Sequence, residues 1–152
     1  MIRDRKLYAI AAVLACSIAA TAQDKGTWRA ASNTAQSITG DIGITADKLF
    51  INFAGFTIAE IRSLNPGELN AVFADASGTG GTGNLYRLNV PAEKKFMHKN
   101  TLCGSEETQW MITYPEGRNL HVAFFSGQKP PVMTAEAISN STDLCGTFLY
   151  AR

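Results

Sequence analysis

The stretch SITGDIGITADKLFINF, residues 37–53, decides the fold of this chain. In its first half, Ile38, Gly40, Ile42 and Ile44 alternate with more polar residues, which is the pattern of a strand with one face in water. In the second half the apolar residues keep the same alternation after a turn. The two halves therefore predict a β-hairpin with one buried face and a fixed register.

The turn of this hairpin is expected at Ala46-Asp47, in a loop of either two or four residues. The expected pairs are Ile44 with Leu49, Ile42 with Ile51, Gly43 with Phe50 and Gly40 with Phe53. Each glycine leaves room for the aromatic ring opposite, which favours a curved antiparallel sheet. Asp41 is expected on the wet face. The hairpin is thus predicted to set the register of a sheet and not to form a site.

Further alternating segments follow, separated by turn signals such as Asn65-Pro66-Gly67. We expect strands at 28–31, 56–61, 69–75, 84–90, 110–114, 120–124 and 145–152, a polar connector at 33–36, and an edge strand or a short helix at 132–138. The segment 56–61 also allows a single helical turn. The predicted fold is all-β, a calycin-like antiparallel barrel or sandwich of about eight strands with one disulfide.

The first 22 residues have the pattern of a signal peptide. Arg3, Arg5 and Lys6 form a basic start, an apolar run follows, and Ala20-Thr21-Ala22 fits the small-x-small rule for cleavage before Gln23. We therefore expect residues 1–22 to be removed and residues 23–152 to form one barrel domain in the periplasm or outside the cell.

Two alternatives exist for this N-terminal segment. A membrane anchor needs about 20 apolar residues, more than the run contains. Residues 13–16, Val-Leu-Ala-Cys, resemble a lipoprotein box, in which Cys16 would be acylated and become the first mature residue. Lipoprotein anchoring through Cys16 is the minority expectation.

Removing residues 1–22 takes away three basic residues and one acidic residue, which leaves 11 Lys and Arg against 12 Asp and Glu, a net charge of −1. This balance gives no support to nucleic acid as a partner. Cys103 and Cys145 remain as an even pair in an exported chain, and we expect them to form a disulfide worth about 4 kcal/mol. The alternative is a reactive Cys103 served by His98 or His121.

The chain offers little that would carry catalysis. Gly78, Gly80 and Gly83 fit the pattern G-x-G-x-x-G, but an alternating strand pattern follows them instead of the helix that a phosphate site needs, so we expect a hairpin loop. His98 and His121 have no partners at metal-ligand spacing, and His121 is expected at the surface.

The remaining catalytic signals are equally weak. Glu106 and Glu107 are neighbours and would point to opposite faces of a strand, and no nucleophile elbow is present. We predict no enzymatic activity, no metal site and no cofactor. A hydrolase would need a convergent polar cluster that spacing does not reveal.

The aromatic residues have two possible roles in a small barrel. Those expected to face inward are Trp28, Phe53, Phe73, Trp110, Tyr114, Phe124, Phe148 and Tyr150. They either fill the core or line a calyx for an apolar ligand.

Gly26-Thr27-Trp28 in the first expected strand and Arg152 in the last resemble the lipocalin and calycin pattern, in which a first-strand Trp packs against a late Arg by cation–π contact. The resemblance implies that Trp28 and Arg152 close one barrel end and are structural. The usual further lipocalin motif is not visible in this chain.

A second resemblance covers most of residues 23–152. The chain is similar to small exported bacterial proteins without an assigned activity, in Trp28 and in the segments 32–35, 37–42, 102–104, 144–147 and 150–152. This likeness implies an exported compartment, a compact β fold and the disulfide.

The leading functional hypothesis is an exported binding module, a barrel that holds an apolar or amphipathic ligand. The alternative is an envelope interaction or inhibitor protein, similar to lysozyme inhibitors, with no enclosed ligand and with residues 78–83 or 94–99 as the protruding loop. Neither hypothesis includes a membrane span after cleavage of the signal peptide.

Overall fold

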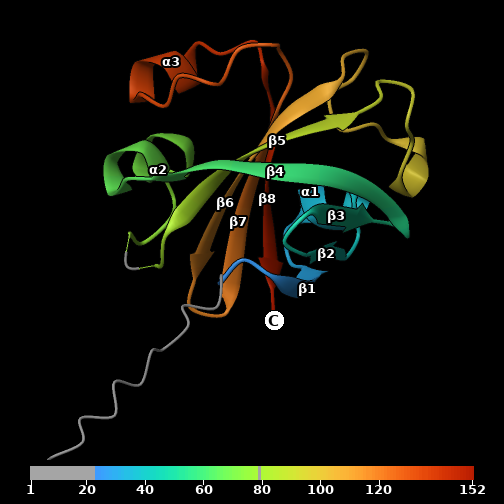
Figure 1. Ribbon diagram of the computed structural model, residues 1–152, viewed down its shortest axis with the longest axis horizontal. Coiled ribbons are helices and arrows are strands. Elements are labelled where there is room, and N and C mark those ends of the chain that lie inside the picture. Colours follow the sequence, from blue (N-terminus) through green and yellow to red (C-terminus); the bar gives the residue numbers. More distant parts are fainter. Residues whose placement is uncertain (1–22, 79) are drawn as a thin grey trace, which may run out of the picture.

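The computed structural model describes residues 23–78 and 80–152, and it forms a closed barrel of eight antiparallel strands in sequence order (Figure 1). The strands are β1 (Gly26–Ala30), β2 (Ile42–Ile44), β3 (Lys48–Ile51), β4 (Ala54–Leu64), β5 (Gly83–Val90), β6 (Thr108–Glu116), β7 (Asn119–Phe125) and β8 (Leu144–Ala151). Short helices connect them: α1 (Asn33–Ile38), α2 (Pro66–Val72), the 3₁₀ helix η1 (Met97–Lys99) and α3 (Ala135–Ser139). The prediction of a small antiparallel barrel is confirmed, and this architecture fits a calycin-like barrel.

The signal-peptide and lipoprotein predictions, Cys16 included, concern residues 1–22, which lie outside the described residues. Within residues 23–78 and 80–152, no helix is long and apolar enough to cross a membrane.

The hairpin at β2 and β3 has the predicted register. Ile44 pairs with Leu49, Ile42 with Ile51 and Gly43 with Phe50. The prediction for the residues before β2 is wrong, because residues 33–38 form helix α1 instead of a connector and a strand. The side chain of Ser32 caps this helix by accepting a hydrogen bond from the amide of Ala35, and a cap of this kind favours a helix over a strand.

The predicted strand at 69–75 is also wrong, because residues 66–72 form helix α2. Asn65 and Glu68 form a capping box, with Pro66 in the first turn. Leu69 and Val72 are three residues apart and bury the same helix face. Of the two alternatives expected for residues 132–138, an edge strand or a short helix, the structure has the helix: α3 begins at Ala135 and is capped by Thr134.

The barrel interior is filled by side chains. The inward-facing residues of the strands are at most 3% exposed, so they contact one another and do not border a hollow. They are Trp28, Ile42, Ile44, Leu49, Ile51, Ile58, Tyr86, Leu88, Val90, Met111, Leu120, Val122, Phe124, Phe148 and Tyr150. Of the expected inward aromatics, Trp28, Phe124, Phe148 and Tyr150 are confirmed.

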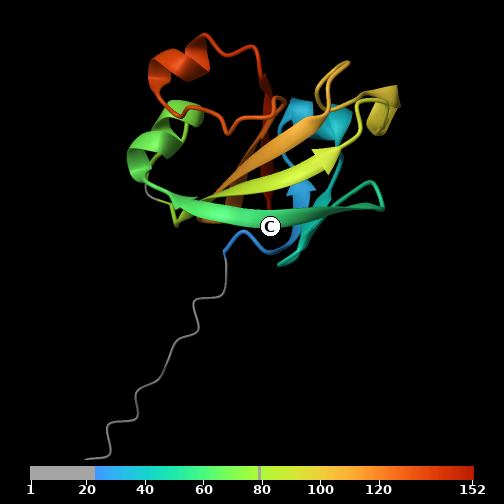
Figure 2. The same cartoon turned by 45° about the horizontal axis from the view of Figure 1, so that its top comes forward.

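A second apolar cluster lies outside the barrel, where α2 and α3 sit over β5, β6 and β7 (Figures 1 and 2). Phe73, Trp110 and Tyr114 belong to this outer cluster, so the expectation that they face the interior is wrong. Both faces of β6 are buried, and alternation then cannot tell inside from outside. Phe53 is in neither cluster, because it is fully exposed.

Cys103 and Cys145 form the predicted disulfide, with 4.9 Å between their Cα atoms. The bond ties the loop before β6 to the start of β8. Both cysteines pack against the interior cluster, so the disulfide joins the barrel wall to its core.

Candidate functional site

The turn between β3 and β4 has an unusual residue at its tip. Ile51 pairs with Ala54, so Asn52 and Phe53 alone make the turn, and both have positive φ, 48° and 68°. Turns of this kind favour Asn followed by Gly, because only glycine takes the second position without strain. Here a phenylalanine occupies it, and its side chain is 101% exposed.

An open groove of about 850 Å³ lies beside this turn. We call it the apolar groove, and define it by Gly40, Gly43, Phe50, Asn52, Phe53 and Met97, with Thr27 and Asp41 at its edge. Its lining residues come from β1, β2 and the residues just before it, the β3–β4 hairpin and η1. Helices α2 and α3 lie over other strands of the barrel (Figure 2). A partner can therefore reach it without opening the barrel.

The floor of the apolar groove is a row of residues across four strands. Thr27 pairs with Gly43, Gly43 with Phe50, and Phe50 with Gly55. The Phe50 ring lies against the backbone of Gly55, where an added Cβ would be 3.1 Å from Cε1 of the ring. The two glycines thus let the ring lie flat across the sheet, as the hairpin pattern predicted for Gly43.

One wall of the apolar groove is formed by Met97, the first residue of η1. The Met97 side chain lies over Gly40, with its Sδ 3.7 Å from where a Cβ would stand. The predicted pairing of Gly40 with Phe53 is therefore wrong: Gly40 lies between α1 and β2 with a φ of 62°, beneath Met97. The Phe96 ring fixes η1 by an edge contact with Phe56, with 6.0 Å between the ring centroids.

Backbone strain gathers around the apolar groove. Asn52, Phe53, His98 and Lys99 are the non-glycine residues with positive φ in residues 23–78 and 80–152. The first two form the turn, and the other two follow Met97 directly in η1. Conformations of this kind cost about 1–3 kcal/mol each and cluster at functional sites. Asp41 completes the edge, where its Oδ1 accepts a hydrogen bond from the Ala30 amide at 2.9 Å.

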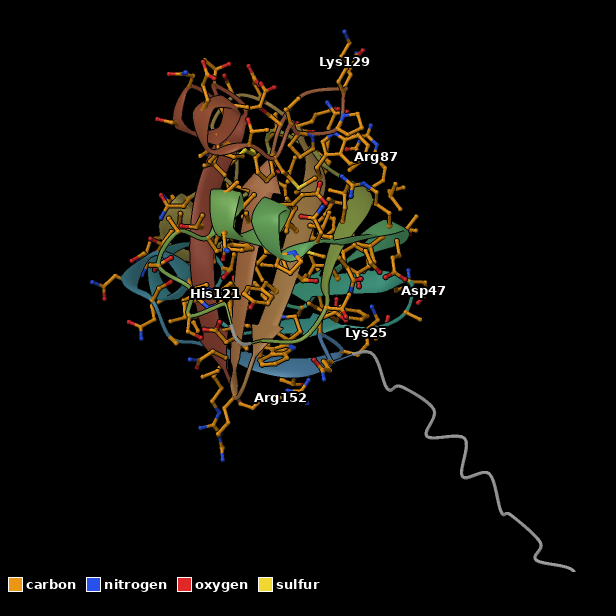
Figure 3. All side chains as sticks on the ribbon, turned by 90° about the vertical axis from the view of Figure 1, so that its left-hand side faces the viewer. Lys25, Asp47, Arg87, His121, Lys129 and Arg152 are labelled. Carbon is orange, nitrogen blue, oxygen red and sulfur yellow. A yellow bond between two sulfur atoms is a disulfide. The ribbon has the colours of Figure 1, made fainter. Side chains whose placement is uncertain are left out.

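Trp28 and Arg152 meet at one end of the barrel. The guanidinium carbon of Arg152 lies 4.0 Å from the centroid of the Trp28 ring, and Arg152 Nη2 donates to the carbonyls of Gln23 and Lys25. Figure 3 shows Arg152 and Lys25 at the end where the chain enters β1. These contacts tie the first described residues to the end of β8.

Sequence reasoning missed a buried carboxylate at the same end. Asp24 is 0% exposed and accepts hydrogen bonds from Tyr86 Oη at 2.6 Å, Thr113 Oγ1 at 2.7 Å and Asn84 Nδ2 at 3.2 Å, with Lys25 Nζ 3.3 Å away. Burial alone would raise the pKa of Asp24, but these donors and the Lys25 charge outweigh it and hold the pKa below its usual value.

The same contacts act on Tyr86, where burial and the neighbouring Asp24 raise the pKa of the phenol. No spacing signal could have found this network, because its members come from the N-terminal segment and two strands that pair only in the fold. Lys25 Nζ also donates to Tyr86 Oη at 2.6 Å. The network fastens the first residues of the domain inside the barrel wall.

The histidines take no part in the apolar groove's walls or floor, and the expectation of a surface His121 is wrong. Its side chain is buried against the rings of Phe73 and Tyr114, at centroid distances of 5.4 and 5.8 Å. Its Nε2 lies 3.5 Å from Glu116 Oε1. His98 is exposed in η1. The structure does not bring either histidine to the disulfide-bonded Cys103 as a catalytic partner.

The glycine-rich segment joins α2 to β5 and is not a hairpin loop. Strand β5 follows it as predicted, so no helix N-terminus stands behind it to hold a phosphate. Glu116 accepts hydrogen bonds from the amides of Ser77 and Gly78 and fastens the segment to the end of β6. Burial would raise the pKa of Glu116, but the bonds from Ser77, with further help from His121, hold it below its usual value.

The described residues hold no group of three or more His, Cys, Asp or Glu side chains placed to bind a metal ion. Glu106 and Glu107 are exposed in the loop before β6. We take the apolar groove as the candidate binding site, because it combines an open depression with a fully exposed aromatic side chain. Comparison of the chain with protein-family models, with curated proteins and with solved structures gives no match to any of them.

Proposed function

We propose that the protein is an exported binding module and that its apolar groove receives an apolar or amphipathic segment of a partner protein. The observation that carries the proposal is Phe53, a fully exposed aromatic residue held in a turn conformation that favours glycine. Neither the stability nor the solubility of the free protein benefits from a ring in this position. A partner that covers the ring supplies the benefit.

The form of the apolar groove supports a partner segment over an enclosed ligand. A small ligand bound in a calyx has most of its surface covered by protein. The interior that would provide this cover is filled by packed side chains. The apolar groove is open along its length, and an exposed aromatic next to a ready-made depression is the arrangement that dominates binding energy in protein interfaces.

We place the contact of an inhibitor at the turn of Asn52 and Phe53, and not at residues 78–83 or 94–99. The segment 78–83 is fastened at its start through Glu116. The segment 94–99 contributes Met97 to the wall of the apolar groove. In the inhibitor-like form of the proposal, Phe53 enters a cleft of an envelope protein while the apolar groove receives a segment of the same protein.

Export is the second part of the proposal. A disulfide between Cys103 and Cys145 is consistent with an oxidising compartment, and the residues before Gln23 have the pattern of a signal peptide. Mass determination of the protein from its own host tests this part. A chain that begins at Gln23 supports signal cleavage, an acylated Cys16 supports a lipoprotein, and an unprocessed chain contradicts export through this segment.

Site-specific photo-crosslinking tests the binding role. A photoreactive phenylalanine derivative replaces Phe53 in one variant and Ile61 in a matched control, because Ile61 is also an exposed apolar residue, 50% exposed, but on β4 away from the apolar groove. After illumination of intact host cells, we expect one discrete protein conjugate from position 53 and none from position 61. Conjugates of equal yield from both positions, or none from either, would contradict the proposal.

A small amphipathic ligand is the second candidate, favoured by the flat floor that Phe50, Gly43 and Gly55 form. Native mass spectrometry of the protein purified from its host separates the two candidates. A bound small molecule that is lost in a Phe50→Ala variant supports the second one. Recovery of empty protein together with the conjugate at position 53 supports the partner protein.

A further inference from the structure

A second opening lies at the end of the barrel where β1 begins and β8 ends. It has a volume of about 970 Å³, and its lining includes Lys25, Arg118 and Arg152. We call it the basic hollow. None of its lining residues lines the apolar groove, so ligand binding in the basic hollow does not depend on the proposed function.

The basic hollow gathers three positively charged side chains, although residues 23–152 have a net charge of −1. Its lining contains three cationic side chains and no Asp or Glu. The nearest carboxylate in the network, Asp24, is buried behind the wall and lies 3.3 Å from Lys25 Nζ. Among residues 23–78 and 80–152, neither Arg118 nor Arg152 forms an ion pair with an Asp or Glu side chain. No acidic side chain of the described residues therefore competes with a ligand for these two guanidinium groups.

Both guanidinium groups are already held in place. The guanidinium carbon of Arg152 lies 4.0 Å from the centroid of the Trp28 ring, and Arg152 Nη2 donates hydrogen bonds to the carbonyl oxygens of Gln23 and Lys25. Arg118 donates from Nε at 3.3 Å and from Nη2 at 2.9 Å to the main-chain oxygen of Arg152. A guanidinium has five N–H donors, so these bonds leave others for a ligand. Because the side chains are fixed beforehand, a ligand that binds them orders little else.

Two glycines of the wall, Gly26 and Gly117, let a ligand come close to the backbone. An added Cβ at Gly117 would meet no atom within 4 Å, so the space beside it is open. An added Cβ at Gly26 would meet only the guanidinium of Arg152, at 3.7 Å from Nη2. Glycine at these positions keeps the space in front of the arginines free of side chains.

We propose that the basic hollow binds a small oxyanion that carries more than one negative charge, such as a phosphate ester or a dicarboxylate. Planar guanidinium groups match the paired oxygens of carboxylate and phosphate, and such charge-assisted hydrogen bonds are the strong ones. Lys25 adds a third positive charge at the rim, next to Tyr86. The bound anion lies between Arg118 and Arg152, against the backbone at Gly117.

Calorimetric titration of the whole exported domain with inorganic pyrophosphate and, separately, with citrate tests this site. We expect saturable binding at one site per chain for at least one of the two anions. Arg118→Gln should weaken it by about tenfold or more, which corresponds to about 1.4 kcal/mol. Arg29→Gln is the matched control, because it removes one positive charge from an exposed residue of β1 that does not line the basic hollow.

Several outcomes would overturn the proposal. It fails if neither anion binds saturably, or if Arg29→Gln weakens binding as much as Arg118→Gln, because the anion then responds only to overall charge. Thermal unfolding of Arg118→Gln checks that the variant is folded. Lys25→Gln is a second variant, and we expect it to bind the anion more weakly than the unchanged protein does. Phe53→Gly should leave anion binding unchanged, so this test and the test of the apolar groove fail independently.

Discussion

The ring of Phe50 lies against the backbone of Gly55, where an added Cβ would come within 3.1 Å of the ring. This contact determines the shape of the apolar groove, because it keeps the ring flat on the sheet and leaves the space between the turn and η1 open. The groove therefore depends on the absence of one side chain on the neighbouring strand.

Gly55→Ala should lift the Phe50 ring and narrow the apolar groove. We expect the free energy of unfolding to fall by about 1 kcal/mol, the lower end of the cost of overpacking, since the ring is at the surface and can shift by a few tenths of an ångström. Urea unfolding measures the change. In a Phe50→Ala background the same substitution should cost much less, because the crowded ring is gone. An equal cost in both backgrounds would show that the contact is not the cause.

Acid should weaken the fold through Asp24. Its pKa is lower in the folded protein than in the unfolded chain, where it lies near the ordinary value of about 3.9. The stabilisation from Asp24 is therefore fully present above that unfolded value and is lost as the pH falls through the folded pKa. The free energy of unfolding, measured by urea between pH 6 and pH 2, should fall in this window.

Asp24→Asn gives the matched test of this assignment. The amide cannot replace the charge that Tyr86, Thr113 and Lys25 face, so we expect a loss of about 2 kcal/mol or more at pH 7. The variant should also lose part of the acid dependence of stability between pH 4 and pH 2. Wild-type acid dependence in the variant would place the responsible carboxylate elsewhere.

The disulfide should contribute most of its stabilisation through the unfolded chain. The double variant Cys103→Ser with Cys145→Ser removes the bond without leaving a free thiol, and we expect it to be less stable by about 4 kcal/mol in the chain-entropy account. Thermal unfolding of the double variant measures the loss. A loss below about 1 kcal/mol would mean that β8 and the loop before β6 stay together without the bond.

The hairpin register was predictable because β2 and β3 have one buried face, so alternation leaves a single register. The same alternation predicts a strand at Ile38, but this residue lies in helix α1, which is capped by Ser32. The alternation also fails at Leu69, where the capping box of Asn65 and Glu68, a motif that the sequence contains, begins helix α2. Local capping signals were the better guide at both places.

The candidate site was not predictable for a different reason. Phe53 continued the apolar parity of Leu49 and Ile51, and phenylalanine is not a turn residue, so the sequence pattern favoured burial. The turn places Phe53 at a position that favours glycine, and residues that break a local sequence rule in this way are expected mainly at functional sites. The Asp24 network was hidden because Asp24, Tyr86 and Thr113 are far apart in sequence.

Phe53→Gly should stabilise the free protein. Glycine removes the strain of positive φ, worth about 1–2 kcal/mol, and loses part of that gain to the greater freedom of the unfolded chain. We expect a net rise of about 0.5–1 kcal/mol in the free energy of unfolding, measured by urea. Phe53→Ala is the control, because it removes the ring but keeps the strained β-carbon, and it should change stability by less than about 0.5 kcal/mol.

The most direct test of the central claim is the yield of partner crosslinking from the wall of the apolar groove when the Phe53 ring is missing. A photoreactive residue in place of Met97 reports on occupancy without altering the turn. If Phe53 is maintained for binding, the conjugate formed from position 97 should be strong in the otherwise unchanged protein. It should fall by about tenfold or more in the Phe53→Gly background, although that protein is the more stable one. An undiminished conjugate in the Phe53→Gly background would contradict the account.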